Sequence, residues 1–145
     1  MKKINFVNND APYLSAENLN QMQDNIEEAI NGNIIWENPN PTSDFEEKTI
    51  NLDLTGYRMF FLTFRNRKDD DAYTCTPAQK GLMQNVMFVG WIPSVSKDIS
   101  AVRHFNIQEN HIYIGKTYGY GIGDHSGFHE NITDVLIPYQ IIGYK

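Results

Sequence analysis

The pattern of apolar and polar residues along this chain changes once, close to Gly32. Before that point, residues 15–31 have a helical spacing, with apolar side chains three, four and three positions apart. They form one narrow stripe, of the kind that meets other helices: Leu19, Met22, Ile26 and Ala29. After Gly32, short apolar runs alternate with turn residues, which is typical of strands. The chain therefore predicts one N-terminal helix followed by a β-rich domain.

The predicted helix has clear start and stop signals. Ser15 is a good N-cap, Glu17 places an acid in the first turn, and Gly32 follows the last helical residue. If Leu19 is an a position of a heptad, the acids of the helix all fall at b, c or f. Copies of the helix can then lie side by side in parallel with little like-charge repulsion. Two heptads are too few to hold such a bundle alone, so we expect the β domain to contribute to the assembly.

The rest of the chain predicts seven or so strands at a spacing of about 8 to 12 residues. They are expected at residues 34–36, 45–54, 57–64, 72–76, 82–92, 100–107 with 112–115 as a hairpin, and 134–144. This spacing favours an antiparallel, jelly-roll-like β-sandwich over residues 34–145. Residues 1–33 then form an attachment segment and oligomerisation helix.

Four local features refine this prediction. The nearly continuous apolar run at residues 57–64 predicts a central strand covered on both faces. Gly90 indicates a bulge, and Pro138 indicates a kink or an edge strand. Residues 116–131, rich in glycine and aromatic residues, read as the longest loop.

Composition narrows the classes of function. The chain of 145 residues has a net charge of −6, and three aspartates follow directly on its one dense basic cluster, residues 65–68. This balance argues against nucleic acid or an anionic membrane as the main partner. The single Cys75 cannot form an intrachain disulfide, and no apolar run approaches the ~18 residues that span a bilayer. Since the N-terminus lacks the apolar segment of a signal peptide, we expect synthesis and retention in the cytosol.

No catalytic motif stands out in the chain. The glycines of residues 116–130 do not have the spacing of a dinucleotide-binding or phosphate-binding loop. Asp124, His125 and His129 carry groups that bind zinc or similar ions. However, a His-x-x-x-His spacing is effective mainly on a helix, and the glycines around these residues disfavour one. We therefore expect no catalytic residue, no cofactor and no bound metal.

The same segment is a candidate binding loop instead. Aromatic side chains on a loop can stack on sugar rings, and polar ones can hydrogen-bond to sugar hydroxyls. The candidate residues are Tyr118, Tyr120, Asp124, His125, Phe128 and His129. The simpler reading, which we favour from sequence, is that these aromatics pack under their own loop or in a subunit interface. Trp36 and Trp91 are expected in the core or in an interface.

Three stretches of the chain share one pattern. They are INFVNNDAPYLSAENLNQMQDNIEEAI at residues 4–30, WENPNPTSDFEEKTINLDLTGY at 36–57 and VLIPYQIIGYK at 135–145. Together they resemble small virion proteins of tailed phages and prophages of Gram-positive bacteria, of the tail-fibre, receptor-binding or head-fibre kind. Residues 66–131 carry no motif of that family, and the chain has no shaft repeats.

This resemblance implies a homotrimeric structural or adhesive protein of a phage particle, with a helix bundle under a β-sandwich. Such a protein is made in the bacterial cytoplasm, assembles with other virion proteins, and can bind a host surface glycan without turnover. The alternative is a monomeric carbohydrate-binding module whose helix packs on its own sandwich. A small hydrolase has no support, because no motif brings two acids together.

Overall fold

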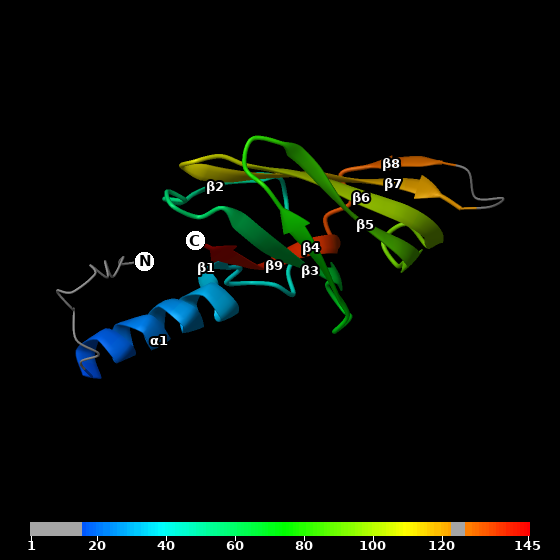
Figure 1. Ribbon diagram of the computed structural model, residues 1–145. Coiled ribbons are helices and arrows are strands. Elements are labelled where there is room, and N and C mark those ends of the chain that lie inside the picture. Colours follow the sequence, from blue (N-terminus) through cyan, green and yellow to red (C-terminus); the bar gives the residue numbers. More distant parts are fainter. Residues whose placement is uncertain (1–15, 123–126) are drawn as a thin grey trace.

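The fold is described from a computed structural model, over residues 16–122 and 127–145. In this part of the chain, nine strands form two antiparallel sheets packed face to face. One helix, α1 (Ala16–Asn31), projects from one end of the sandwich (Figure 1). The predicted antiparallel β-sandwich with one N-terminal helix is confirmed. The N-terminal cap Ser15 lies outside the described residues.

The two sheets differ in their strand order. The four-stranded sheet runs β1 (Asn33–Glu37), β9 (Val135–Tyr144), β3 (Met59–Arg67), β4 (Tyr73–Ala78). The five-stranded sheet runs β2 (Lys48–Asn51), β7 (His111–Gly121), β6 (Lys97–Ile107), β5 (Met83–Ile92), and β8 (Phe128–Glu130) also pairs with β7. The first and last described strands are therefore neighbours, and β9 lies inside its sheet.

The core lies between the sheets and follows the two-residue period of the strands. In β3, Phe60, Leu62 and Phe64 point inward and are fully buried. Phe64 meets Phe105 of β6 across the interface, with ring centroids 5.9 Å apart. Each large apolar side chain buried in this way contributes roughly 1.5–3 kcal/mol. None of the described α1 side chains belongs to this core, so the sandwich has its hydrophobic cluster independently of the helix.

One inward position of β6 holds a charge. The fully buried guanidinium of Arg103 donates to the carbonyls of Gly115 (3.0 Å), Phe45 (3.1 Å) and Val135 (3.4 Å), and it packs on the Phe45 ring. Burial lowers the pKa of Arg103 to about 10, while nearby Glu46 acts in the opposite direction. The side chain thus stays charged at neutral pH and links strands of both sheets to the loop before β2.

Two expectations about the middle of the chain are wrong. Residues 116–131 do not form one long loop, because β7 continues to Gly121 and β8 pairs with it again at Phe128–Glu130. There is no bulge at Gly90, since β5 and β6 pair without a register shift. Gly90 instead leaves space for the Phe88 ring, whose nearest atom would lie 2.8 Å from an added Cβ.

Three further expectations need correction. The strand expected at residues 45–54 is only four residues long, Lys48–Asn51. β3 is central, but only its inner face is fully buried, and Met59 on the outer face is exposed. Pro138 does not make β9 an edge strand, because β1 and β3 pair on its two sides. Pro138 itself lies beyond the β1 ladder, which ends at Gln140, and at a register shift against β3, which fits the kink.

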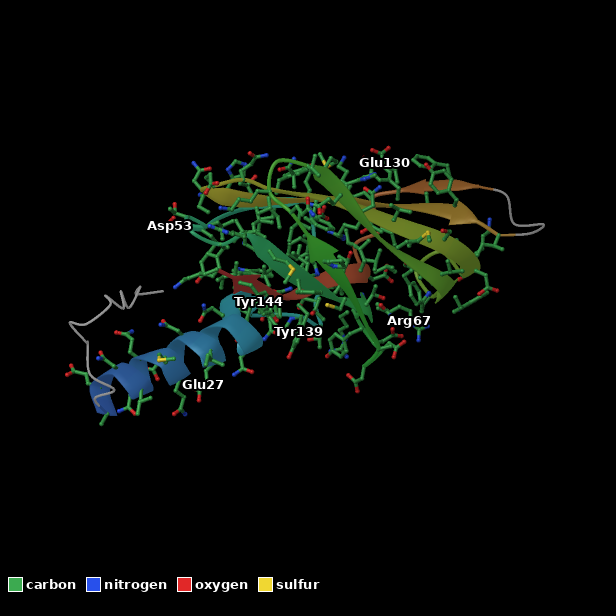
Figure 2. The ribbon with its side chains drawn as sticks, viewed as in Figure 1. Glu27, Asp53, Arg67, Glu130, Tyr139 and Tyr144 are labelled. Atoms are coloured by element: carbon green, nitrogen blue, oxygen red, sulfur yellow. The ribbon has the colours of Figure 1, made fainter. Side chains whose placement is uncertain are left out.

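The junction between helix and sandwich is at Gly32. Its φ of +64° is the left-handed conformation expected at a helix stop. An added Cβ would lie 2.6 Å from Ile142 Cγ2 and 2.7 Å from Tyr144 Cζ, so the helix end lies against the last residues of β9. Figure 2 shows Tyr139 and Tyr144 on the side of the sandwich near α1 and Glu130 on the opposite side.

Candidate functional site

The apolar stripe of α1 is uncovered by the rest of the protomer. Leu19, Met22 and Ile26 are 48%, 38% and 54% exposed, although they are the most apolar described side chains of the helix. On the helix surface, Gln23 donates to Glu27 over one turn at 3.0 Å. The fourth predicted seam residue, Ala29, lies on the same helix, but its side chain is outside the description. Within the described residues, the helix does not use its stripe to pack on its own sandwich.

Three of the predicted loop residues come together on the outer face of the five-stranded sheet. Tyr120 and Phe128 are directly opposite each other in the β7–β8 pair. The rings of Tyr118 and Phe128 stack with centroids 5.8 Å apart, and those of Tyr120 and Phe128 are 5.4 Å apart. Tyr118 also contacts the His104 ring. These aromatics stand on strands rather than on a loop, and Tyr120 and Phe128 remain exposed.

The same face continues as an apolar surface to the edge of the sheet. In the strand register, Tyr118 is next to Val102 and then Met87, and Tyr120 leads through Ser100 to Val89. We call this surface the outer band: Met87, Val89, Trp91, Val102, Tyr118, Tyr120 and Phe128. Its β5 members are 50–59% exposed. The prediction that Trp91 lies in the core is wrong, and its place in an interface stays a prediction. Trp36, by contrast, packs against the core.

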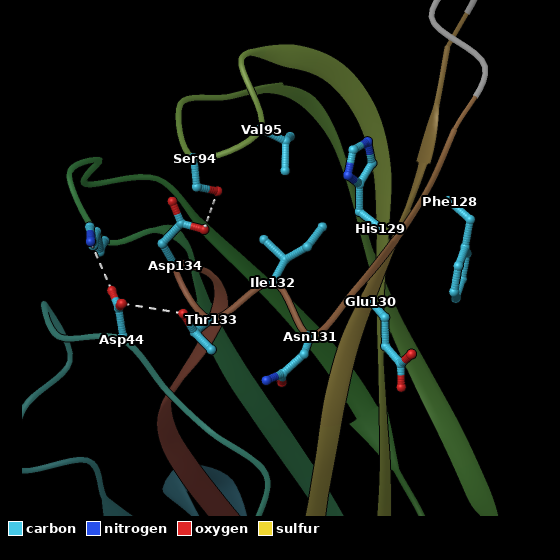
Figure 3. Close-up of a pocket in the computed structure, with 11 residues that line it drawn as sticks. Asp44, Ser94, Val95, Phe128, His129, Glu130, Asn131, Ile132, Thr133 and Asp134 are labelled. Atoms are coloured by element: carbon cyan, nitrogen blue, oxygen red, sulfur yellow. Dashed lines mark hydrogen bonds and ion pairs between the residues drawn. The ribbon is translucent and has the colours of Figure 1, made fainter.

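His129 lies on the other side of β8 from Phe128 and faces a polar cleft of about 380 Å³ (Figure 3). The cleft is bordered by the turn after β5, the loop before β2 and the segment between β8 and β9. Its side chains include Asp44, Ser94, His129, Glu130, Asn131, Thr133 and Asp134. His129 Nε2 is buried and has no hydrogen-bond partner within the described protein. The cleft therefore offers polar groups to a small hydrophilic ligand.

The wall of the cleft is held by two hydrogen-bonded carboxylates. Asp44 accepts from Lys68 Nζ at 2.8 Å and from Thr133 Oγ1 at 3.2 Å, and Asp134 accepts from Ser94 Oγ at 2.8 Å (Figure 3). The hydrogen bond from Lys68 lowers the pKa of Asp44, against the small effect of burial, and raises the pKa of Lys68. Asp44 is thus a fixed anion that joins the β3–β4 turn to the cleft.

The structure separates the remaining candidate residues. Asp124 and His125 lie outside the described residues. Among residues 16–122 and 127–145, no three His, Cys, Asp or Glu side chains gather as a metal site would require, and no helix is long and apolar enough to cross a membrane. Cys75 is exposed on β4. No nucleophile in the described part of the chain pairs with a histidine base.

Sequence reasoning missed the β5 part of the outer band and most of the cleft. In β5, apolar residues occupy both faces, with Val86 and Ile92 buried and Met87 and Val89 exposed. That double-sided pattern was the available signal, but it is also the pattern of a strand buried on both faces. The cleft residues come from four distant segments, and no local pattern in the sequence joins them.

Comparison with protein-family models, with curated protein sequences and with solved structures found no match.

Proposed function

We propose that this chain is a structural or adhesive protein of a phage particle, which forms a homotrimer through α1 and binds without catalysis. The exposed stripe of α1 is the observation that carries this proposal. A helix of 16 residues is marginal in water on its own, and this one has no support from the described core of its protomer. The helix is stable only if its stripe is covered, and the stripe fits copies of itself.

The energetics favour association. Leu19, Met22 and Ile26 are each about half exposed in the protomer, and covering them is worth roughly 1 kcal/mol per side chain. The acids Glu17, Asp24 and Glu27 are exposed and stand off the seam in a parallel bundle. The free energy gained by covering the stripes of three helices helps to hold three sandwiches together, but it is not enough to do so alone. The sandwiches therefore also contact one another.

The two ends of the sandwich support different roles. Gly32, at the end of α1, packs against Tyr144 at the end of β9. Asp134 of the polar cleft directly precedes the start of β9. The ten residues of β9 span roughly 33 Å. Attachment at the helix end leaves the cleft at the far end, where a host surface glycan can reach it. The hydrogen-bonding groups of the cleft suit a saccharide.

The test is a mass measurement in solution on the full chain and on Ile26→Asp. We expect the wild type to have three times the 16.7 kDa of the protomer at micromolar concentration. Ile26→Asp should fall to the protomer mass, since an unpaired carboxylate cannot be buried in the seam. Asp24→Asn, an exposed position off the seam, is the control and should keep the wild-type mass. A wild type that stays monomeric would overturn the proposal.

The second candidate is a monomeric carbohydrate-binding module, and the polar cleft is what favours it. Calorimetry with a saccharide, combined with the mass in solution, separates the two functions. A module binds purified cell-wall saccharide in calorimetry while its mass stays that of one protomer. The virion protein binds, if at all, as the trimer.

A further inference from the structure

The edges of the two sheets are not equally protected. An exposed edge strand can pair with another chain, and proteins prevent this with short edges, bulges, prolines or charges. Four edges here carry such a feature. β1 has a bulge and Glu37, β4 contains Pro77, β2 has four residues including Lys48, and β8 has three residues including Glu130.

β5 is the exception. It has ten residues, MQNVMFVGWI, with no charge, no proline and no bulge against β6. In the described part of the chain, no strand pairs with its other edge. Near one end, Arg67 Nη1 donates to the Trp91 carbonyl at 3.2 Å, and near the other, the Gln84 side chain bonds to Gln79. Between these two ends, the edge is available for pairing.

The outer band begins at this same strand. Three half-exposed aromatics (Trp91, Tyr120, Phe128) offer roughly 300 Å², and the half-exposed Met87 and Val89 enlarge this surface. More than roughly 300 Å² is in the range of the largest apolar patch of a typical monomer, and it is a substantial share of the ~800 Å² that each partner gives to a stable interface. Charged side chains stand only at its margins, where Asp98 faces Trp91 and Glu130 faces Tyr118.

We propose that β5 and the outer band are a contact between sandwiches, covered by a second copy of this chain. This inference rests on the proposed trimer, because α1 brings copies together at high effective concentration. A sugar or a lipid cannot pair with a strand edge, and a surface dominated by methionine, valine and aromatic side chains offers few partners to hydroxyl groups. In a closed three-fold ring, each subunit meets its neighbours through two different surfaces, and β5 supplies one of them.

The experiment places a charge on this edge and follows both mass and backbone exchange. Val89→Lys adds the protection that β5 lacks at an exposed position, so the fold is spared. The matched control is Thr49→Lys, an exposed position on the already protected β2. Met87→Gln is a milder second variant, in case the lysine disturbs folding. Thermal unfolding checks each variant, and hydrogen exchange of residues 83–92 is measured in the wild type before and after dilution.

We expect Val89→Lys to raise the concentration at which the assembly dissociates by more than about tenfold, with Met87→Gln intermediate and Thr49→Lys unchanged. The β5 amides should be protected in the wild-type assembly and lose that protection on dilution. If both β5 variants match the wild type, or these amides exchange equally fast in both states, the inference falls. The trimer proposal would then still stand if Ile26→Asp disperses the assembly. If the β5 amides become protected from exchange only after another particle protein is added, that protein and not a second copy of this chain covers β5, and the inference is wrong.

Discussion

At the scale of single residues, Arg103 is the least expected side chain of the core. The inward positions of β6 read Ile99, Ala101, Arg103, Phe105 and Ile107, so a charge interrupts an otherwise apolar face. Its three carbonyl acceptors lie in two strands and one loop that are far apart in the sequence. The guanidinium therefore replaces backbone pairing where the strands and the loop meet.

Removing this side chain should be costly. Arg103→Met keeps the length of the side chain but leaves the carbonyls of Gly115, Phe45 and Val135 without this donor. We expect a loss of about 2–4 kcal/mol in the free energy of unfolding, because buried unpaired polar groups lose their water without compensation. Arg103→Lys should lose less, since its ammonium still donates. Urea unfolding followed by tryptophan fluorescence measures the difference.

The exposed Arg58→Met is the control for this substitution and should stay within about 0.5 kcal/mol of the wild type. Equal stability of Arg103→Met and Arg58→Met would show that the carbonyls find other partners. In that case Arg103 would not link the two sheets.

Residue patterns predicted some of these features and could not predict others. The common helix face of Leu19, Met22 and Ile26 was predicted because a helix carries its own period, and its role as an oligomerisation seam stays a prediction. Arg103 was not, because its partners are 12, 32 and 58 positions away in the sequence. His129 and Phe128 were assigned to one binding loop, but neighbouring residues of a strand point to opposite faces.

Among the secondary-structure elements, β7 contains two glycines that the sequence indicated as loop residues. Gly119 and Gly121 made residues 116–131 look like a loop, yet both lie in β7. An added Cβ at Gly119 would lie 2.5 Å from Ile132 Cδ1 and from Ile99 Cδ1. The glycine marks close packing inside a strand. Sequence alone does not separate this role from that of a turn.

Close packing at the junction makes Gly32 more sensitive to substitution than Gly56. Gly32→Ala would strain a residue with φ of +64° and also press its Cβ against Ile142 and Tyr144. Gly56, with φ of +83°, has nothing within 4 Å of an added Cβ. We expect Gly56→Ala to cost about 1 kcal/mol from strain alone and Gly32→Ala about 2–3 kcal/mol. Thermal unfolding of both variants compares them directly.

The same comparison tests whether the helix direction is fixed by this contact. Gly32→Ala should also lower the helical signal in far-UV circular dichroism, because the last turn of α1 must move away from β9. Gly56→Ala should leave that signal unchanged. Equal stability losses in the two variants would mean that Ile142 and Tyr144 yield easily and do not orient the helix.

For the molecule as a whole, the described part of the protomer leaves the apolar α1 stripe and the outer band uncovered, together with the unpaired backbone edge of β5. Few charges interrupt them: the ion pair Lys116–Glu130 lies at the margin of the outer band, and Arg65–Asp71, Lys68–Asp44 and Lys80–Glu109 lie elsewhere on the surface. An assembly held by such surfaces depends on apolar burial. Its stability should therefore depend on protein concentration and very little on salt.

If unfolding is coupled to dissociation, the wild-type melting temperature should rise by about 2–5 °C for each tenfold increase in protein concentration. The mass should be unchanged in 1 M salt, where the Debye length is about 3 Å and exposed ion pairs are largely screened. Ile26→Asp should melt at one temperature at every concentration, because its sandwich unfolds as a monomer. A wild-type melting temperature independent of concentration, together with a trimer mass, would mean that the sandwiches unfold while the helices still hold the copies together. The contact of β5 and the outer band with a neighbouring copy would then contribute nothing to stability.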